Sequence, residues 1–190
     1  AVTDFPLFHA VLDEIYRGNP QYVYPLRGDI EGILSDKNKA YDGSNLKMWV
    51  VLEDGRRPVG RIAAFIDRER NEQLDLPIGG LGFFESIEDD AVAELLFKAS
   101  EDWLRSAGMH AVDGPINFGE RDKFWGLLIR GWYRPLYQET YNPPYYQRMF
   151  EDRNYQPHEQ CLTMRGVVSK FPGERLAGLA GRVREKYGLY

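Results

Sequence analysis

Cysteine, histidine and long apolar runs are all scarce in this sequence. Cys161 is the single cysteine, so no disulfide can form within the chain. His9, His110 and His158 lie far apart, without the close spacing that metal ligands usually show, and the sequence predicts no metal site. The strongly apolar stretch 61–66 is much shorter than the ~18 residues of a membrane span.

A surplus of basic charge is also lacking. The formal net charge is -5 and the sequence pI is about 5.3, which excludes the electrostatic footprint of a protein that binds a phosphate backbone. The first residues do not show the charged-then-apolar pattern of a signal peptide. We therefore expect a cytoplasmic protein with neither nucleic acid nor membrane as a partner. Its 190 residues, 43% of them hydrophobic, suffice for one compact domain.

The first half of the sequence predicts a helix followed by a β-hairpin. Apolar residues recur at steps of three and four from Asp4 to Arg17, which is typical of an amphipathic helix, and a short second helix is expected at 29–34. The β-rich stretches 47–53 and 58–66 flank Asp54-Gly55, a pair suited to a tight turn. The sequence thus predicts two antiparallel strands.

A strand, a long helix and another strand come next. The stretch 78–85 predicts a third strand, whose glycines indicate either a bulge or a close approach to the backbone. The clearest helix pattern runs from Ala91 to Ala107, with Asp90 as the expected N-cap, and "HAVDGPI" then predicts a strand. This succession favours a right-handed crossover between parallel neighbours. The expected fold class is therefore α/β or α+β.

The remaining sequence predicts further short elements. We expect helices at 123–130 and 144–153, strands at 134–141 and 159–169, and an amphipathic helix at 174–187. We expect one domain over residues 1–170 and a helical connector over 171–190.

The order of these elements resembles the GNAT superfamily of acyl-CoA N-acyltransferases. The stretches that carry the resemblance across nearly the whole chain are "YPLRGDI", "RPVGRIAAFIDRERNE", "GFFES", "GPINFGERDKFWGLL" and "YNPPYYQRMFEDRNY". It implies a mostly antiparallel mixed sheet with a parallel pair at the family's strands four and five and with helices on both faces. It also implies a second acyltransferase-like region after this chain.

The resemblance implies acetyl-CoA or another acyl-CoA as donor. In the family, strand four binds the pantetheine arm, and a glycine-containing loop with a basic residue places the pyrophosphate at the next helix N-terminus. These parts correspond to Gly80–Glu85 and to the loop 86–91, "SIEDDA", so Phe83, Phe84, Ser86 and Ile87 become candidate donor-binding residues. The loop lacks the family's glycines and basic residue. Its acids either cap the helix or would repel two phosphates.

The resemblance also implies two catalytic residues. Glu85 ends the strand at which many family members hold a carboxylate that removes the amine proton, although it could be a surface acid. Tyr146 matches the tyrosine that protonates the departing thiolate, although it could simply pack on the sheet. Tyr145 is its neighbour and would point elsewhere on a helix.

An insertion, residues 117–142, replaces the family's brief connection where acceptors approach. Arg121 and Trp125 are candidate contacts for a small-molecule amine, or else they belong to a capped amphipathic helix. Asn117 could bind a cofactor carbonyl or form an Asx turn. The expected function is acyl transfer from a CoA thioester to an amine. The alternatives are a catalytically silent ligand-binding or structural module and transfer from a donor other than CoA.

Overall fold

The computed structural model describes residues 4–120, 122–170 and 172–188. It divides into two compact units, residues 1–155 and 156–190. None of the helices within the described ranges has the length and apolar character that crossing a membrane requires.

The sheet of the first unit has four strands in the order β1-β2-β3-β4. β1 (Leu46–Glu53) and β2 (Arg57–Phe65) form the predicted antiparallel hairpin. β3 (Ile78–Ser86) pairs antiparallel with β2 and parallel with β4 (Ala111–Asp113). The hairpin turn contains Asp54 and Gly55, both with positive φ, as the sequence predicted. The expected fold class, a mixed α/β sheet with one parallel pair, is confirmed.

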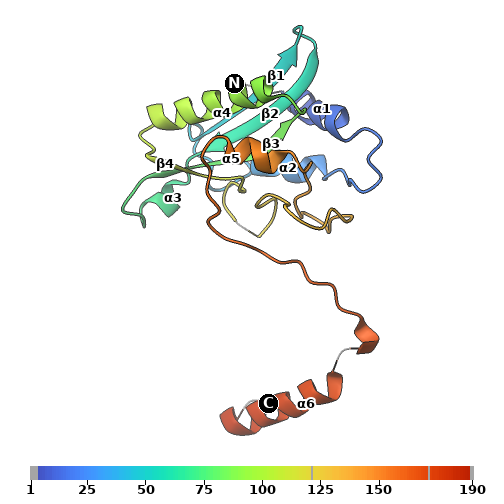
Figure 1. Cartoon of the computed structure of the whole chain (residues 1–190). Helices are drawn as coiled ribbons and strands as arrows, with labels where there is room; N and C mark the ends of the chain where they lie inside the picture. Colours follow the sequence, from blue (N-terminus) through green and yellow to red (C-terminus); the bar gives the residue numbers. More distant parts are fainter. Residues whose placement is uncertain (1–3, 121, 171, 189–190) are drawn as a thin grey trace. The chain divides into compact units, whose positions relative to one another are not determined.

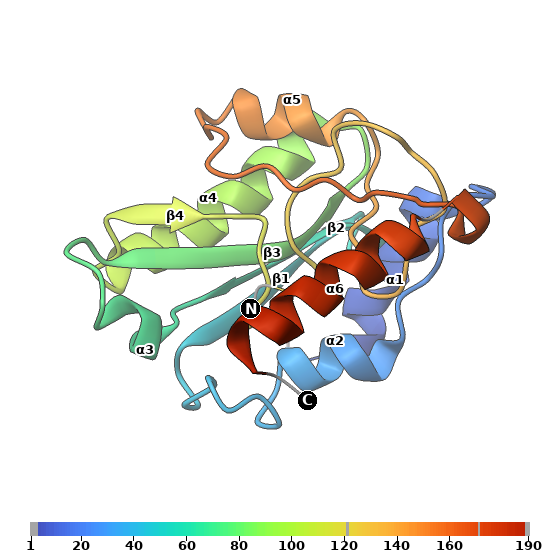
Figure 2. The ribbon, with the colours of Figure 1, turned by 90° about the horizontal axis from the view of Figure 1, so that it is seen from below.

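Helices cover both faces of this sheet (Figure 1; Figure 2). α4 (Asp90–Ser106) and α5 (Tyr146–Glu151) pack on one face, where Phe84, Phe97 and Phe150 share a core. α1 (Phe5–Tyr16) and α2 (Arg27–Ile33) pack on the other, around Phe8 and Phe65. Burial of these apolar faces is the main term that holds the layers together.

Two helix starts differ in detail from the sequence predictions. The N-cap of α4 is Asp89 rather than Asp90, because the Asp89 carboxylate accepts from the backbone N–H groups of Ala91 and Val92. No helix is predicted between the second and third strands, but α3 (Arg68–Asn71) lies there, and Asp67 caps it in the same way. Both caps are aspartates that satisfy N–H groups without a partner inside the helix.

The insertion does not form the helix predicted at 123–130 or the strand predicted at 134–141. Gly126 and Gly131 have φ of +78° and +75°, values that an α-helix or a strand does not allow. Instead, the Asn142 side chain accepts from Leu128 N–H and donates to the Leu128 carbonyl oxygen, which folds the segment back on itself.

The second unit contains a short 3-10 helix (Val168–Lys170) and α6 (Gly173–Tyr187). The helix prediction at 174–187 is confirmed, whereas the strand predicted at 159–169 is wrong. Residues 159–169 are exposed, and none of them belongs to a strand of the four-stranded sheet.

Candidate functional site

The parallel strands β3 and β4 separate after a short contact. Their pairing spans Ile78–Gly80 and Ala111–Asp113, and Ile116 N–H then donates to the Leu81 carbonyl oxygen. A Cβ on Gly82 would lie 2.0 Å from the Ile116 carbonyl oxygen, so only glycine allows this approach. The rest of β3 continues without β4 beside it.

An extra residue interrupts β3 just beyond this point. Arg61 pairs with Glu85 and Ala63 with Gly82, so Phe83 and Phe84 together face the single residue Ile62. This is a β-bulge, and Phe83 takes a φ of +54° to form it. Both alternatives that the sequence left open for 78–85 are therefore present: the bulge lies at the phenylalanines, and the close approach lies at Gly82.

A cavity of about 370 Å³ lies beside the bulge. Its lining includes Phe83 and Phe84, the segment 22–30 and parts of the insertion. The buried lining residues form its floor, and these are Ile30, Arg61, Phe84, Glu85, Asn142 and Tyr146. Lining residues that are exposed form its rim, among them Tyr24, Leu26, Leu136 and Tyr137. The cavity thus has a charged, buried end and an open end that is mostly apolar but includes the exposed Arg134.

Glu85 is the centre of the floor. Its Oε2 accepts from the hydroxyl of Tyr16 at 2.7 Å and from the hydroxyl of Tyr146 at 2.9 Å, and its Oε1 is 3.7 Å from Nη2 of Arg61. Burial raises the pKa of Glu85 to about 6, although the Arg61 charge and the two tyrosine hydrogen bonds act in the opposite direction. A carboxyl with this pKa can accept and release protons near neutral pH.

Arg61 holds the other side of the carboxylate. It is 2% exposed, its Nη1 donates to the Phe8 carbonyl oxygen at 3.0 Å, and its guanidinium lies 4.6 Å from the Phe8 ring centroid. Its Nε has no hydrogen-bond partner among the described residues. The buried arginine therefore supplies the positive charge that a buried carboxylate needs.

Tyr146 and Tyr145 both reach the end of β3, but only Tyr146 lines the cavity. The Tyr146 hydroxyl accepts from Ser86 N–H at 2.7 Å, which leaves its own proton for Glu85. Burial and then the Glu85 charge raise the pKa of Tyr146 well above its ordinary value, so the phenol keeps its proton. The Tyr145 hydroxyl donates to the Ser86 carbonyl oxygen.

The start of α4 does not fit a pyrophosphate. Asp89 occupies the N–H groups of Ala91 and Val92, and Asp90 pairs with Arg148 of α5 at 2.9 Å. Among the predicted donor-binding residues, Phe83 and Phe84 line the cavity, whereas Ser86 N–H is taken by Tyr146 and Ile87 N–H by the Val59 carbonyl oxygen. These occupied amides offer no anion site of the kind expected at a helix N-terminus.

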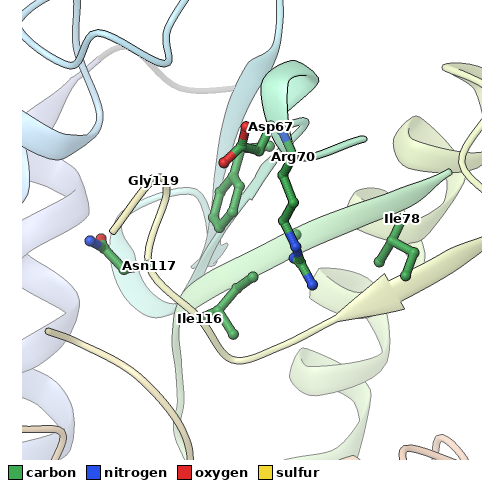
Figure 3. A pocket seen from close by; sticks show the side chains of 8 residues that line it. Asp67, Arg70, Ile78, Ile116, Asn117 and Gly119 are labelled. Atoms are coloured by element: carbon green, nitrogen blue, oxygen red, sulfur yellow. Dashed lines mark hydrogen bonds between the residues drawn. The ribbon is translucent and has the colours of Figure 1, made fainter. Parts of the chain in front are cut away.

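Two further predicted residues, Asn117 and Trp125, do not line this cavity. Asn117 lines a separate hollow of about 10 Å³, room for one water, together with Arg70 of α3 (Figure 3). Trp125 packs against the core between α1, α2 and the sheet. Arg121 falls outside the described residues.

Sequence reasoning missed Tyr16 and Arg61. Tyr16 belongs to the apolar stripe of the predicted helix and Arg61 to a predicted strand, and neither pattern indicates a site. A charge inside the apolar run 59–66 was the available signal, because a strand buried on both faces accepts an arginine only with a partner.

Comparisons with known proteins give two curated relatives. The chain is 31% identical over 153 residues to Protein YghO of Escherichia coli (strain K12), which covers 80% of this chain and 39% of that protein. It is 30% identical over 140 residues to a bacterial ceramide synthase of Caulobacter vibrioides (strain NA1000 / CB15N), which covers 72% of this chain and 36% of that protein. The chain thus spans less than two fifths of either relative. No family model matches.

Solved structures show a weaker likeness. The aminoglycoside acetyltransferase AAC(6')-Iy, in complex with a CoA bisubstrate analogue, has 14% identity and a TM-score of 0.49, with 86% of this chain and 91% of that chain covered. A ribosomal-protein-alanine N-acetyltransferase from Brucella melitensis biovar Abortus 2308 has 12% identity and a TM-score of 0.46, with 87% and 98% covered. Both scores are below 0.5, so neither structure assigns an activity to this chain.

Proposed function

We propose that this chain is a GNAT-like domain that transfers an acyl group from a thioester to the amine of a small molecule. The observation that carries the proposal is the buried Glu85, held by two phenols and an arginine at the floor of a cavity. The separation of β3 from β4 beside that cavity supports it, because the resemblance places the donor arm there.

The residues of the floor can manage the protons of this reaction. The acceptor arrives as an ammonium and gives one proton to Glu85, whose Oε1 neither tyrosine contacts. The neutral nitrogen then forms a bond to the thioester carbonyl carbon as the carbon–sulfur bond breaks. Tyr146 gives its proton to the departing sulfur and recovers one from Glu85. The second nitrogen proton leaves to solvent, which completes the amide.

The donor is the less constrained half of the proposal. Acetyl-CoA or another acyl-CoA could bind only with its pyrophosphate held elsewhere than at the capped start of α4. A thioester of pantetheine on a carrier protein needs no such contact. The name of one relative, a ceramide synthase, also supports amide formation, since a ceramide is an N-acylated long-chain amine. The second region implied by the sequence resemblance, with residues 171–190 as connector, belongs to the same proposal.

A catalytically silent binding module is the second candidate. The observation in its favour is that Asp89 and Tyr146 already occupy the amides that would hold a donor. In this case the cavity would bind a ligand without acyl transfer.

Turnover by the chain and by its Glu85→Gln variant separates these candidates. Acetyl-CoA, a longer acyl-CoA and an acyl-pantetheine are each offered with a panel of primary amines, and free thiol and amide are measured. We expect turnover with at least one donor, reduced about 100-fold by Glu85→Gln. The control is Glu151→Gln, which changes an exposed acid on α5. No amide from any donor, despite ligand binding, would support the silent module.

A further inference from the structure

Four tyrosines form a contiguous group next to Glu85. The rings of Tyr16 and Tyr22 are stacked with centroids 3.5 Å apart, and the Tyr24 and Tyr141 centroids lie 5.0 and 5.8 Å from that of Tyr22. Tyr22, Tyr24 and Tyr141 line the cavity. The proposed acyl transfer gives these three residues, here called the tyrosine wall, no chemical role.

The charge of Glu85 acts on this wall. Burial first and the Glu85 carboxylate second raise the pKa of Tyr22, so its phenol stays neutral and its ring retains an unperturbed π system. The guanidinium of the buried Arg61 lies over the Phe8 ring, and its charge acts on the pKa of Tyr22 in the direction opposite to that of Glu85. Within the ranges that the structure describes, no lysine or arginine is placed over the rings of Tyr22, Tyr24 or Tyr141.

Aromatic rings beside a carboxylate are suited to a positively charged nitrogen. A ligand ammonium within about 6 Å of a ring centroid is attracted by the ring quadrupole, and more strongly where water is excluded. Glu85 adds a negative charge at the buried end of the same cavity. The open end is lined by Val23, Leu26 and Leu136, which are 39%, 61% and 66% exposed, and by the exposed Arg134, whose charge solvent screens.

We propose that the tyrosine wall and Glu85 form a receptor for the ammonium group of an amphiphile. The cationic nitrogen lies against the rings of Tyr22, Tyr24 and Tyr141, and the apolar part of the ligand lies along Val23, Leu26 and Leu136. The acceptor role of this ligand rests on the proposed function, whereas its binding does not. A quaternary ammonium would occupy the receptor but has no proton to release, so it would inhibit acyl transfer.

Calorimetric titration of the whole chain tests the receptor without any thioester. The probes are octyltrimethylammonium, which has the charge and the chain, tetramethylammonium, which has only the charge, and octanol, which has only the chain. We expect octyltrimethylammonium to bind at least about tenfold more tightly than either of the others. Octanol binding as tightly as octyltrimethylammonium would overturn the proposal.

Variants locate the binding. Tyr22→Leu removes the ring and is expected to weaken octyltrimethylammonium about tenfold, whereas Tyr22→Phe keeps the ring and should bind within about threefold of the unchanged chain. Tyr133→Leu, which alters an exposed tyrosine outside the cavity lining, is the control. Equal affinity of the Tyr22→Leu and unchanged chains would refute the role of the wall. If Tyr22→Leu does not fold, the comparison of the three probes on the unchanged chain still tests whether the cavity binds an amphiphilic ammonium.

The receptor and the proposed function fail in different ways. Ammonium binding without amide formation from any thioester leaves the receptor standing and rejects acyl transfer. Amide formation that octyltrimethylammonium does not inhibit leaves acyl transfer standing and rejects the receptor.

Discussion

The hydroxyl of Tyr16 donates to Oε2 of Glu85 at 2.7 Å, although 69 residues separate the two in the sequence. Tyr16 is the last residue of α1, and Glu85 lies one residue before the end of β3. The helix therefore delivers a phenol to the carboxylate from the face opposite α4 and α5. Both groups are buried, so the contact is shielded from water.

Removal of this hydroxyl should change the pH dependence of turnover. The hydrogen bond from Tyr16 lowers the pKa of Glu85 against the effect of burial, so Tyr16→Phe is expected to raise that pKa above about 6. The acidic limb of the pH profile of kcat/KM should shift to higher pH. Tyr155→Phe is the matched control, since Tyr155 donates to Glu101 away from the cavity. If the acidic limb does not move, the hydrogen bond from Tyr16 does not set the pKa of the group that accepts the proton.

Tyr145 and Tyr146, the N-cap and the first residue of α5, allow a second matched pair. Tyr146→Phe removes the proton donor to the leaving sulfur, and we expect kcat to fall about 100-fold with little change in donor affinity. It also leaves Ser86 N–H unpaired, at a cost of about 1–3 kcal/mol in the free energy of unfolding. Tyr145→Phe loses the bond to the Ser86 carbonyl oxygen and should keep near-normal kcat. Steady-state kinetics and urea unfolding measure both variants; equal kcat values would assign Tyr146 to packing.

Glu85 should also make stability depend on pH. Its pKa is 4.5 when unperturbed and about 6 in the folded chain, so the folded state holds the proton more tightly than the unfolded state. Ionisation therefore costs stability as pH rises from about 4.5 to above 6, by about 2 kcal/mol in total. Glu85→Gln should lack this loss.

Urea unfolding at pH values below and above this window provides the measurement. The stability of Glu85→Gln relative to the unchanged chain should be more favourable at the higher pH by about 2 kcal/mol. A difference that is the same at both pH values would mean that Glu85 has an ordinary pKa.

The close approach at Gly82 gives a prediction about the fold itself. Gly82→Ala places a methyl group 2.0 Å from the Ile116 carbonyl oxygen, and we expect it to lower the free energy of unfolding by about 1–3 kcal/mol. Gly32→Ala is the control, because nothing lies within 4 Å of its Cβ position in α2, and it should stabilise by about 0.5–1 kcal/mol. Thermal unfolding compares the two; a neutral Gly82→Ala would show that β3 and the 114–116 segment can separate.

Periodicity predicted the parts of the fold that are amphipathic and regular. α1, α4 and the β1-β2 hairpin carry apolar residues at the repeat of their own element, and the turn residues mark their ends. The parallel β3-β4 pair followed from the succession of a strand, a long helix and another strand. Glu85 and Tyr146 came from the resemblance, and the structure places their oxygens 2.9 Å apart.

Local pattern failed where a segment is held by contacts distant in sequence. The residue pattern of the insertion predicts a helix and a strand, but the positive φ of Gly126 and the hydrogen bonds of the Asn142 side chain determine its path. Tyr16 has the apolar ring that a helix stripe requires, and nothing nearby in the sequence shows that its hydroxyl meets a carboxylate. Contacts of this kind depend on the folded chain as a whole.

The bulge at Phe83 and Phe84 decides which side of the sheet carries negative charge. Leu81 points into the core beneath α4, and strict alternation along β3 would send Glu85 into that same apolar layer. The extra residue reverses the alternation, so Phe84 fills the layer and Glu85 emerges toward Arg61 and Tyr16. A regular strand of this composition would bury an acid among phenylalanines, and the cavity floor would have no carboxylate beside Arg61.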